Sequence, residues 1–253
     1  GCDDFSGNLV TRLIDIQDVS LQYPDGTTAL SHASLWVESG ENVAIVGPSG
    51  CGKSTLLRLA SGLIEPTSGS VERTKNIQYV FQDSTLLPWR NVRKNVALNL
   101  ELQKCEPAEI DRRVDTALSL VGLMDSSRKL PRQLSGGMKM RVSLARSLAC
   151  EPQVFLFDEP FAALDEFSRE RLNLELRSIL QSNKSGSLFV THSIAEAVFL
   201  SNRVLIMSQQ PGTIVKSVHI PFSQERTHEL RYSAEFAHIC GDIASTLREL
   251  AQL

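Results

Sequence analysis

The stretch "GPSGCGKST", residues 47–55, combines glycines, a lysine and hydroxyl side chains directly before an apolar segment. Its spacing fits G-x-x-x-x-G-K-[ST], the pattern of a phosphate-binding loop. Glycines let backbone N–H groups approach phosphate oxygens closely, and a following helix adds the positive end of its dipole. Lys53 can supply a charge for the β- and γ-phosphates, and Ser54 a hydroxyl for Mg²⁺. We therefore predict a nucleotide site made by Gly47, Pro48, Ser49, Gly50, Cys51, Gly52, Lys53, Ser54 and Thr55.

Two carboxylates, Asp158 and Glu159, close the apolar run "VFLFDE". An acid at the end of a buried parallel strand can reach Mg²⁺ beside a phosphate loop, because ligands bind beyond the carboxyl ends of such strands. We predict that Asp158 lies near the metal and that Glu159 polarises an attacking water. The alternative is a solvated strand end, which a preceding phosphate loop disfavours.

A second glycine motif, "LSGG" at residues 134–137, precedes the predicted helical segment "MKMRVSLARSLA". The free N–H groups of a helix start, with the hydroxyl of Ser135 and the bare backbone of Gly136 and Gly137, form a second anion site. A single nucleotide can use both helix starts only if they converge on it, within one chain or across two.

The elements that must position these groups alternate between strand and helix, which indicates a parallel sheet with helical crossovers. Residues 13–23 alternate between apolar and polar, as in a half-exposed antiparallel strand. Residues 66–71, "PTSGSV", are expected to form a turn, and residues 76–82 a strand. The pattern from about residue 86 to residue 133 is helical. We predict an α/β fold: a phosphate-loop NTPase core with a mainly parallel sheet, an antiparallel β region near the N-terminus and a helical insertion subdomain.

Composition excludes several classes of protein. The net charge of −3 argues against nucleic acid as the main partner. The five cysteines are odd in number and lack C-x-x-C spacing, which fits reduced thiols in a cytosolic protein better than disulfides or a zinc site. Apolar runs are too short to span a membrane, and the first residues do not have the pattern of a signal peptide.

The order of the motifs carries a resemblance. Over residues 13–218 the chain resembles the ATPase subunit of ABC transporters, because six motifs occur in the same order: a phosphate loop, Gln82, "LSGG", "FDEP", "AALD" and His192. The segment "LLPWRNV", the methionine after "LSGG" and the tail entered by "PF" are similar to the nitrate, sulfonate and taurine importer branch. The resemblance implies an ABC-type ATPase domain at 12–220. From the residues themselves we predict a flexible end at 1–11 and a tail with a terminal helix at 221–253.

Roles for single residues follow from the resemblance. Tyr23 would stack on adenine, or simply pack on the core. Gln82 would contact the metal or the attacking water and couple to a membrane partner, unless it is an ordinary polar strand end. Asp165 of "AALD" would bridge two subunits, or cap a helix. His192 would contact the γ-phosphate, although a lone histidine is by default a structural residue.

The function implied is ATP hydrolysis with Mg²⁺ by a peripheral subunit at the cytoplasmic face of the membrane. Two copies would pair head to tail, each ATP lying between the phosphate loop of one and the "LSGG" of the other. Together they would drive import of a small anionic or zwitterionic solute, such as nitrate, a sulfonate or taurine. The translocation path of the solute would belong to a multi-span permease docked near residues 82–89. A periplasmic or surface solute-binding protein would deliver the solute to that permease. Trp89 would line the docking groove, or cap the subdomain's own core.

Two other classes remain as alternatives. The chain could be a soluble ABC-type ATPase acting on a non-transport partner such as DNA or a ribosome, but such proteins usually carry a coiled-coil insertion or tandem cassettes. It could also be a catalytically silent binding module. The presence of both Glu159 and His192 argues against that.

Overall fold

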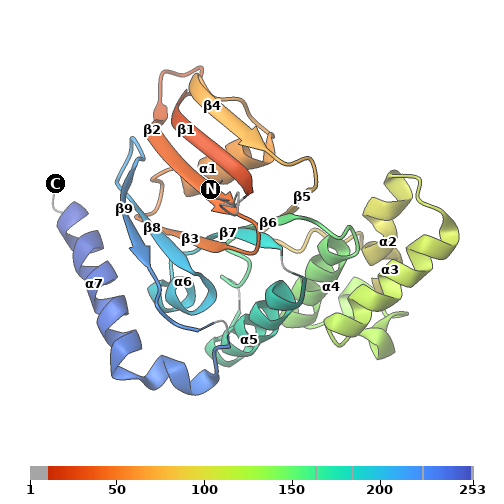
Figure 1. The fold of residues 1–253 in the computed structure, drawn as a ribbon. Helices are drawn as coiled ribbons and strands as arrows, with labels where there is room; N and C mark the ends of the chain where they lie inside the picture. Colours follow the sequence, from red (N-terminus) through yellow and green to blue (C-terminus); the bar gives the residue numbers. More distant parts are fainter. Residues whose placement is uncertain (1–10, 163, 184, 224, 252–253) are drawn as a thin grey trace, which may run out of the picture.

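A computed structural model describes residues 11–251 apart from residues 163, 184 and 224, and Figure 1 shows the fold. Of the predicted flexible end, all but Thr11 lies outside the described residues. The strands are β1 (Arg12–Gln22), β2 (Thr28–Glu38), β3 (Asn42–Val46), β4 (Ser68–Arg73), β5 (Ile77–Val80), β6 (Val154–Asp158), β7 (Gly186–Val190), β8 (Arg203–Met207) and β9 (Ile214–His219). The helices are α1 (Lys53–Ser61), α2 (Val92–Leu102), α3 (Pro107–Leu120), α4 (Gly136–Leu148), α5 (Glu166–Asn183), α6 (Ile194–Leu200) and α7 (Ala234–Leu250).

Two sheets form the framework (Figure 1). The larger has six strands in the order β5-β6-β7-β3-β8-β9, and the smaller has three in the order β2-β1-β4. Pairs in the larger sheet are parallel except the edge pair β8–β9, whereas the smaller sheet is antiparallel. The predicted fold class, α/β with a mainly parallel sheet and an antiparallel region near the N-terminus, is confirmed.

The central strands are buried on both faces. In β3, Val43 and Ile45 belong to a core shared with α1 and the small sheet, while Ala44 and Val46 belong to a second core on the opposite face. Side chains of a strand alternate between faces, so a strand covered on both sides is apolar throughout. This explains the unbroken apolar runs that end at the phosphate loop and at the two carboxylates.

One prediction of local structure is wrong. Residues 68–71, expected to complete a turn, instead begin strand β4, which pairs with β1. Serine and glycine have low strand propensity, but an available antiparallel partner outweighs propensity. A Cβ at Gly69 would lie 2.4 Å from the carbonyl oxygen of Asp18, so the close approach of the two strands requires glycine there.

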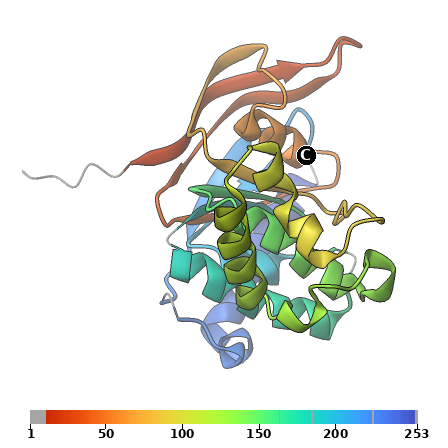
Figure 2. The ribbon, with the colours of Figure 1, turned by 90° about the vertical axis from the view of Figure 1, so that its right-hand side faces the viewer.

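Helices α2 and α3 extend to one side of the large sheet, at the right of Figure 1, and face the viewer in Figure 2. Val96 and Leu100 of α2, with Val114 and Leu118 of α3, are fully buried in the same core as α4. These helices lie within the segment predicted to be a helical subdomain, and they pack against the helix that follows "LSGG".

The tail packs on α6. Arg226 is buried, and its Nη1 donates to the carbonyl oxygens of Val198 and Phe199 at 2.7 and 2.8 Å. Carbonyls in the last turn of a helix have no partner within the helix, so this arginine satisfies them. Phe236 and Ile243 of α7 are buried as well. This packing supports a role for the tail in covering the core of the domain.

We expect Ile243→Ala to lower the free energy of unfolding by about 2–5 kcal/mol, because truncating a fully buried isoleucine removes apolar contact and leaves a cavity. Urea unfolding followed by circular dichroism measures the change. Arg248→Ala, at an exposed position of the same helix, is the matched control and should change stability little. Equal stability of the two variants would show that the tail does not contribute to the core.

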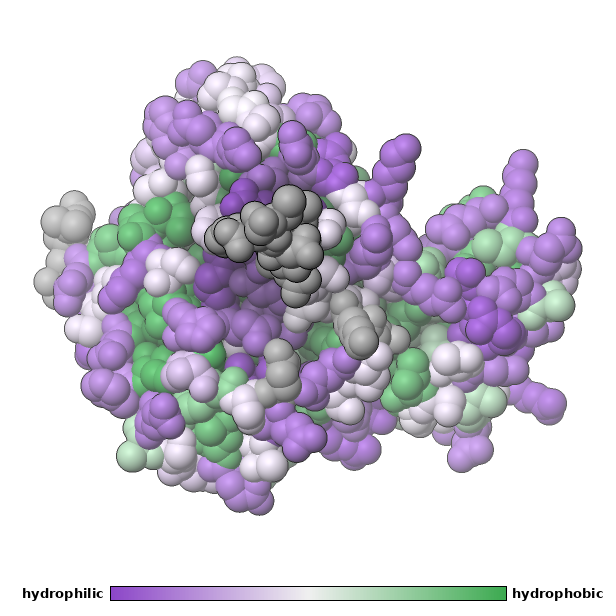
Figure 3. Space-filling view, in the orientation of Figure 1, coloured by the Kyte–Doolittle hydropathy of each residue, from purple (hydrophilic) through white to green (hydrophobic). Residues whose placement is uncertain are grey.

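On the face seen in Figure 3, hydrophilic residues predominate and hydrophobic ones are scattered among them. Within the part of the chain that the structure describes, no helix combines the length and apolarity needed to cross a membrane.

Candidate active site

The phosphate loop joins the end of β3 to the start of α1. Gly50 and Gly52 have φ angles of 78° and 99°, a region that glycine enters without steric cost. Lys53, the first residue of α1, is buried, and its Nζ donates to the carbonyl oxygens of Gly47 and Pro48 at 2.9 and 2.8 Å. The ammonium group is therefore held inside the turn of the loop.

A hollow of about 300 Å³ lies against this loop, a volume at the lower end of the range for small-molecule sites. Its walls combine an aromatic ring, bare backbone, hydroxyl groups, a lysine and a carboxylate. The lining residues are Tyr23, Ala29, Ser49, Gly50, Gly52, Lys53, Ser54, Thr55, Glu159 and Gln210.

Cys51 lies beneath the loop rather than in the hollow. It is 1% exposed, and burial raises the pKa of its thiol. A Cβ at Gly47 would lie 2.9 Å from its Sγ and 3.0 Å from the carbonyl oxygen of Met207. Cys51 therefore fills space under the loop, and Gly47 has no room for a side chain.

The loop and the carboxylate of β6 meet through a hydrogen bond. The hydroxyl of Ser54 donates to Oδ1 of Asp158 at 2.8 Å, and the hydroxyl of Tyr79 donates to Oδ2 at 2.8 Å. Burial, followed by the negative charge of Asp158, raises the pKa of the Tyr79 hydroxyl. The structure thus brings together Ser54 and Asp158, both predicted to serve Mg²⁺.

Glu159 adopts a backbone conformation that is unusual for its residue type. Its φ angle is 46°, while its N–H donates to the carbonyl oxygen of Val190 at 2.9 Å. A left-handed conformation costs a residue other than glycine about 1–3 kcal/mol and tends to occur at functional sites. Oε2 of Glu159 lies 3.1 Å from Nδ1 of His192. Glu159, the predicted water-polarising residue, therefore lines the hollow and contacts His192, the predicted γ-phosphate ligand, which does not itself line the hollow.

The "LSGG" motif forms a separate site. Ser135 caps α4, accepting a hydrogen bond from the N–H of Met138 at 3.3 Å. Among the described residues, Cβ atoms at Gly136 and Gly137 would meet Leu164 and Leu172, at ordinary contact distances of 3.7 and 3.8 Å. Packing among these residues therefore does not require the two glycines, and their backbone is open to contact from outside the chain.

A second hollow, of about 350 Å³, lies over this helix start. It is lined by Ser135, Gly136, Gly137, Met138, Arg141, Leu164, Asp165, Ser168, Arg171 and Leu172. None of the residues that the structure describes lines both hollows. The sequence left open whether the two helix starts converge on one nucleotide within one chain or across two chains. In this structure they do not converge within one chain.

Three further residues predicted at the site, Tyr23, Asp165 and Gln82, lie in different places relative to the two hollows. Tyr23 lines the first hollow, packs on the core, and places its hydroxyl 3.1 Å from Oγ1 of Thr55. Asp165 lines the second hollow, and its Oδ1 accepts from the N–H of Ser168, which lowers the pKa of the Asp165 carboxyl. It therefore caps the start of α5. Gln82 is exposed beyond the end of β5 and lines neither hollow.

Sequence reasoning missed Ala29 and Gln210, which line the first hollow, and Tyr79, which contacts Asp158. Tyr79 lies within a strand that was predicted, but nothing in the sequence indicated that this strand would be the neighbour of β6. Gln210 lies after β8, where its Nε2 donates to the carbonyl oxygen of Thr28 at 3.2 Å. No local pattern marks it, because only the order of strands in the sheet brings it to the hollow.

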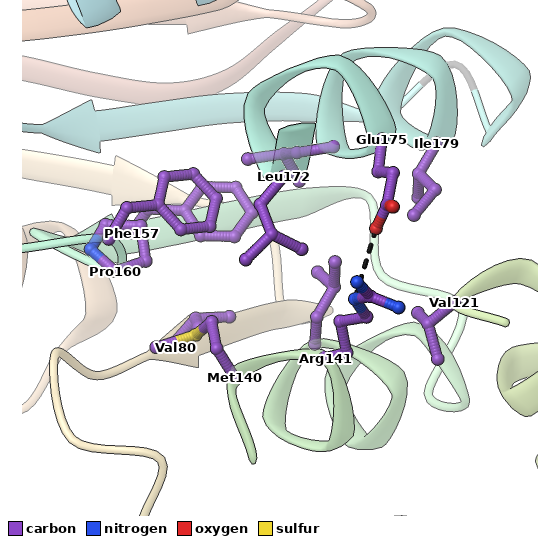
Figure 4. A pocket seen from close by; sticks show the side chains of 12 residues that line it. Val80, Val121, Met140, Arg141, Phe157, Pro160, Leu172, Glu175 and Ile179 are labelled. Atoms are coloured by element: carbon purple, nitrogen blue, oxygen red, sulfur yellow. Dashed lines mark ion pairs between the residues drawn. The ribbon is translucent and has the colours of Figure 1, made fainter. Parts of the chain in front are cut away.

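An apolar cavity between α4, α5 and the ends of β5 and β6 appears in Figure 4. Nε of Arg141 and Oε2 of Glu175 pair across its edge at 3.3 Å. Its volume of about 10 Å³ is close to the minimum that one water molecule needs. The cavity is therefore a packing gap rather than a ligand site.

Comparison with known proteins agrees with this geometry. Residues 30–162 match the family model described as ABC transporter. The nitrate import ATP-binding protein of Synechocystis sp. is 42% identical, over 94% of both chains. The aliphatic sulfonates import ATP-binding protein of Bacillus licheniformis is also 42% identical, over 79% of this chain and 82% of that protein.

Solved structures show the same fold. The dimeric ABC transporter cassette MJ0796 aligns with a TM-score of 0.72 and 29% identity, covering 83% of this chain and all of that chain. A second dimeric structure of that cassette, in a post-hydrolysis state bound to ADP and Pi, has a TM-score of 0.71. The chain belongs to the ABC transporter family, and its fold is that of an ATP-binding cassette.

Proposed function

We propose that the chain hydrolyses ATP as one of two identical subunits that drive import of a small anionic or zwitterionic solute through a separate membrane permease. The observation that carries the proposal is the separation of the two hollows. One contains the phosphate loop and Glu159, the other the "LSGG" helix start, and their described lining residues do not overlap. Head-to-tail pairing of two copies would bring the first hollow of one chain against the second hollow of the other.

The residues present fit Mg²⁺. Ser54 and Asp158 offer hard oxygen ligands that already contact each other. Among the described residues there is no cluster of three or more His, Cys, Asp or Glu able to hold a metal. This agrees with a magnesium ion that keeps waters and phosphate oxygens as ligands rather than entering an all-protein cage. Bound there, Mg²⁺ would neutralise charge on the phosphates.

The remaining steps belong to the chain's own groups. Lys53 binds phosphate oxygens, and the loop N–H groups orient them. Glu159 accepts a hydrogen bond from the attacking water and directs it in line, while His192, held beside Glu159, donates to the γ-phosphate. Ser135 of the partner subunit completes the site. Catalysis in this scheme is positioning and electrostatic stabilisation. Gln82, exposed at the end of β5, is the proposed link to the permease and to the metal or water.

The proposed solute class rests on the names of the relatives, which include nitrate and aliphatic sulfonate import proteins. We place the subunit at the cytoplasmic face of the membrane, with a solute-binding protein acting on the permease and no nucleic acid partner. Membrane vesicles that contain the assembled transporter test this proposal. Uptake of nitrate, taurine and an alkyl sulfonate should depend on ATP, and uptake of none of them would contradict the solute class.

The turn that carries Trp89 has the form expected of a docking surface. The fully buried side chain of Asn95 accepts from the N–H of Leu87 and donates to the carbonyl oxygens of Leu87, Arg90 and Asn91. The turn is therefore fixed from within, while the Trp89 side chain is 73% exposed. The alternative that Trp89 caps the subdomain core is wrong, since a ring this exposed covers little.

We expect Trp89→Ala to weaken association with the permease at least tenfold and to leave ATP binding unchanged, because exposed tryptophans are frequent interface anchors. Co-purification with the permease and nucleotide titration of the isolated subunit measure the two effects. Leu102→Ala removes another apolar side chain, 72% exposed at the far end of α2, and should keep full association. Loss of nucleotide affinity in Trp89→Ala would instead indicate a structural role.

A further inference from the structure

Tyr79 lies in β5, one strand away from the carboxylate that ends β6. In the parallel pairing of these strands, Tyr79 is the partner of Leu156. Asp158 follows Leu156 by two positions and therefore points to the same face of the sheet. That face packs on α1, which begins with the end of the phosphate loop. Sheet register therefore directs the Tyr79 ring and the Asp158 carboxylate to one place.

The carboxylate of Asp158 is held at both oxygens. Ser54 donates to Oδ1 and Tyr79 to Oδ2, each at 2.8 Å, and the two hydroxyls come from different elements. A carboxylate held at one oxygen can still rotate about its terminal bond, whereas two donors on opposite oxygens fix its plane. Each oxygen retains acceptor capacity, because a carboxylate has about four lone-pair sites.

The position of the Tyr79 ring does not depend on its hydroxyl. The ring lies 4.4 Å from the ring of Phe81, centroid to centroid, and packs against the core beneath the small sheet. Phenylalanine at position 79 should therefore occupy the same space and lose only the hydrogen bond to Asp158. This separates the effect of the hydroxyl from the effect of packing.

We propose that Tyr79 is a positioning residue, which fixes the Asp158 carboxylate for Mg²⁺ without itself touching metal or nucleotide. The inference rests on the proposed function in one respect, that Asp158 serves the magnesium ion. Partners that orient a metal ligand typically contribute 10- to 100-fold to metal affinity or activity. Tyr79 thus extends the metal site to β5, the strand that leads directly to Gln82.

The test is Tyr79→Phe in the full chain, with binding of a fluorescent ATP analogue measured at increasing Mg²⁺ and in EDTA. We expect the Mg²⁺ concentration for half-maximal enhancement to rise about tenfold, while binding in EDTA stays at the wild-type value. Phe81→Leu, which removes the neighbouring ring but keeps the Tyr79 hydroxyl, is the matched control and should retain the wild-type Mg²⁺ dependence.

A double-mutant cycle separates positioning from packing. In an Asp158→Asn background the charged carboxylate is gone, so adding Tyr79→Phe should cause no further shift in Mg²⁺ dependence. An equal shift in both backgrounds, or none in Tyr79→Phe alone, would overturn the role of Tyr79. If the wild type binds the analogue equally well with Mg²⁺ and in EDTA, the assignment of the magnesium site fails first, and with it this inference.

Discussion

Replacement of Glu159 by glutamine is expected to lower ATP hydrolysis by about 10²- to 10⁴-fold, the usual contribution of a positioned general base. The substitution keeps the size of the side chain and removes its charge. Because the nucleotide is then consumed slowly, ATP should remain bound and hold two chains together, as a ligand that binds only the closed dimer stabilises it by mass action. Light scattering should show a shift from monomer to dimer with Mg-ATP and none with Mg-ADP.

A second substitution, at Ser135 of the "LSGG" motif, provides the control for this experiment. Ser135 caps α4 and lines a hollow that has no described residue in common with the phosphate-loop hollow. Adding Ser135→Arg to Glu159→Gln places a bulky side chain over that helix start, so the dimer should not form while each monomer still binds ATP through Lys53. A dimer that survives Ser135→Arg would mean that the "LSGG" motif does not close the site.

Truncation of Lys53 should have the second large effect. Its ammonium group is held inside the loop by the carbonyl oxygens of Gly47 and Pro48. With ATP bound, this ammonium would form a buried, hydrogen-bonded charge pair with the phosphates. Removing one partner of such a pair costs about 2–5 kcal/mol, so Lys53→Ala should lower ATP affinity at least about 30-fold and lower turnover as well. Titration with a fluorescent nucleotide and phosphate release measure both.

Lys53→Arg should fail to restore binding, because a planar guanidinium does not fit where a compact ammonium lies between two carbonyl oxygens. Lys75→Ala, at an exposed lysine outside the site, provides the charge-matched control and should behave as wild type. Unchanged nucleotide affinity in Lys53→Ala would remove the phosphate loop from the proposed mechanism.

The sequence by itself determined those parts of the protein that depend on neighbouring residues. The phosphate loop spans a few consecutive positions, so its glycines, Lys53 and Ser54 predict a phosphate site wherever the loop lies. The same holds for the helix start at Ser135, and for strands such as β3 that are apolar throughout because both faces are covered. The helical pattern predicted from about residue 86 to residue 133 likewise contains α2 and α3.

Only the tertiary structure decided which distant residues meet. Ser54 and Asp158 are 104 positions apart, and Tyr79 and Asp158 are 79 apart; strand order and register, which no local pattern encodes, bring them together. Pairing with β1 likewise turned the segment at Gly69 into a strand against its own propensity. The separation of the two hollows is also a property of the whole fold, because each hollow is lined by segments far apart in the chain, and it is this separation that directs the "LSGG" motif toward a second copy.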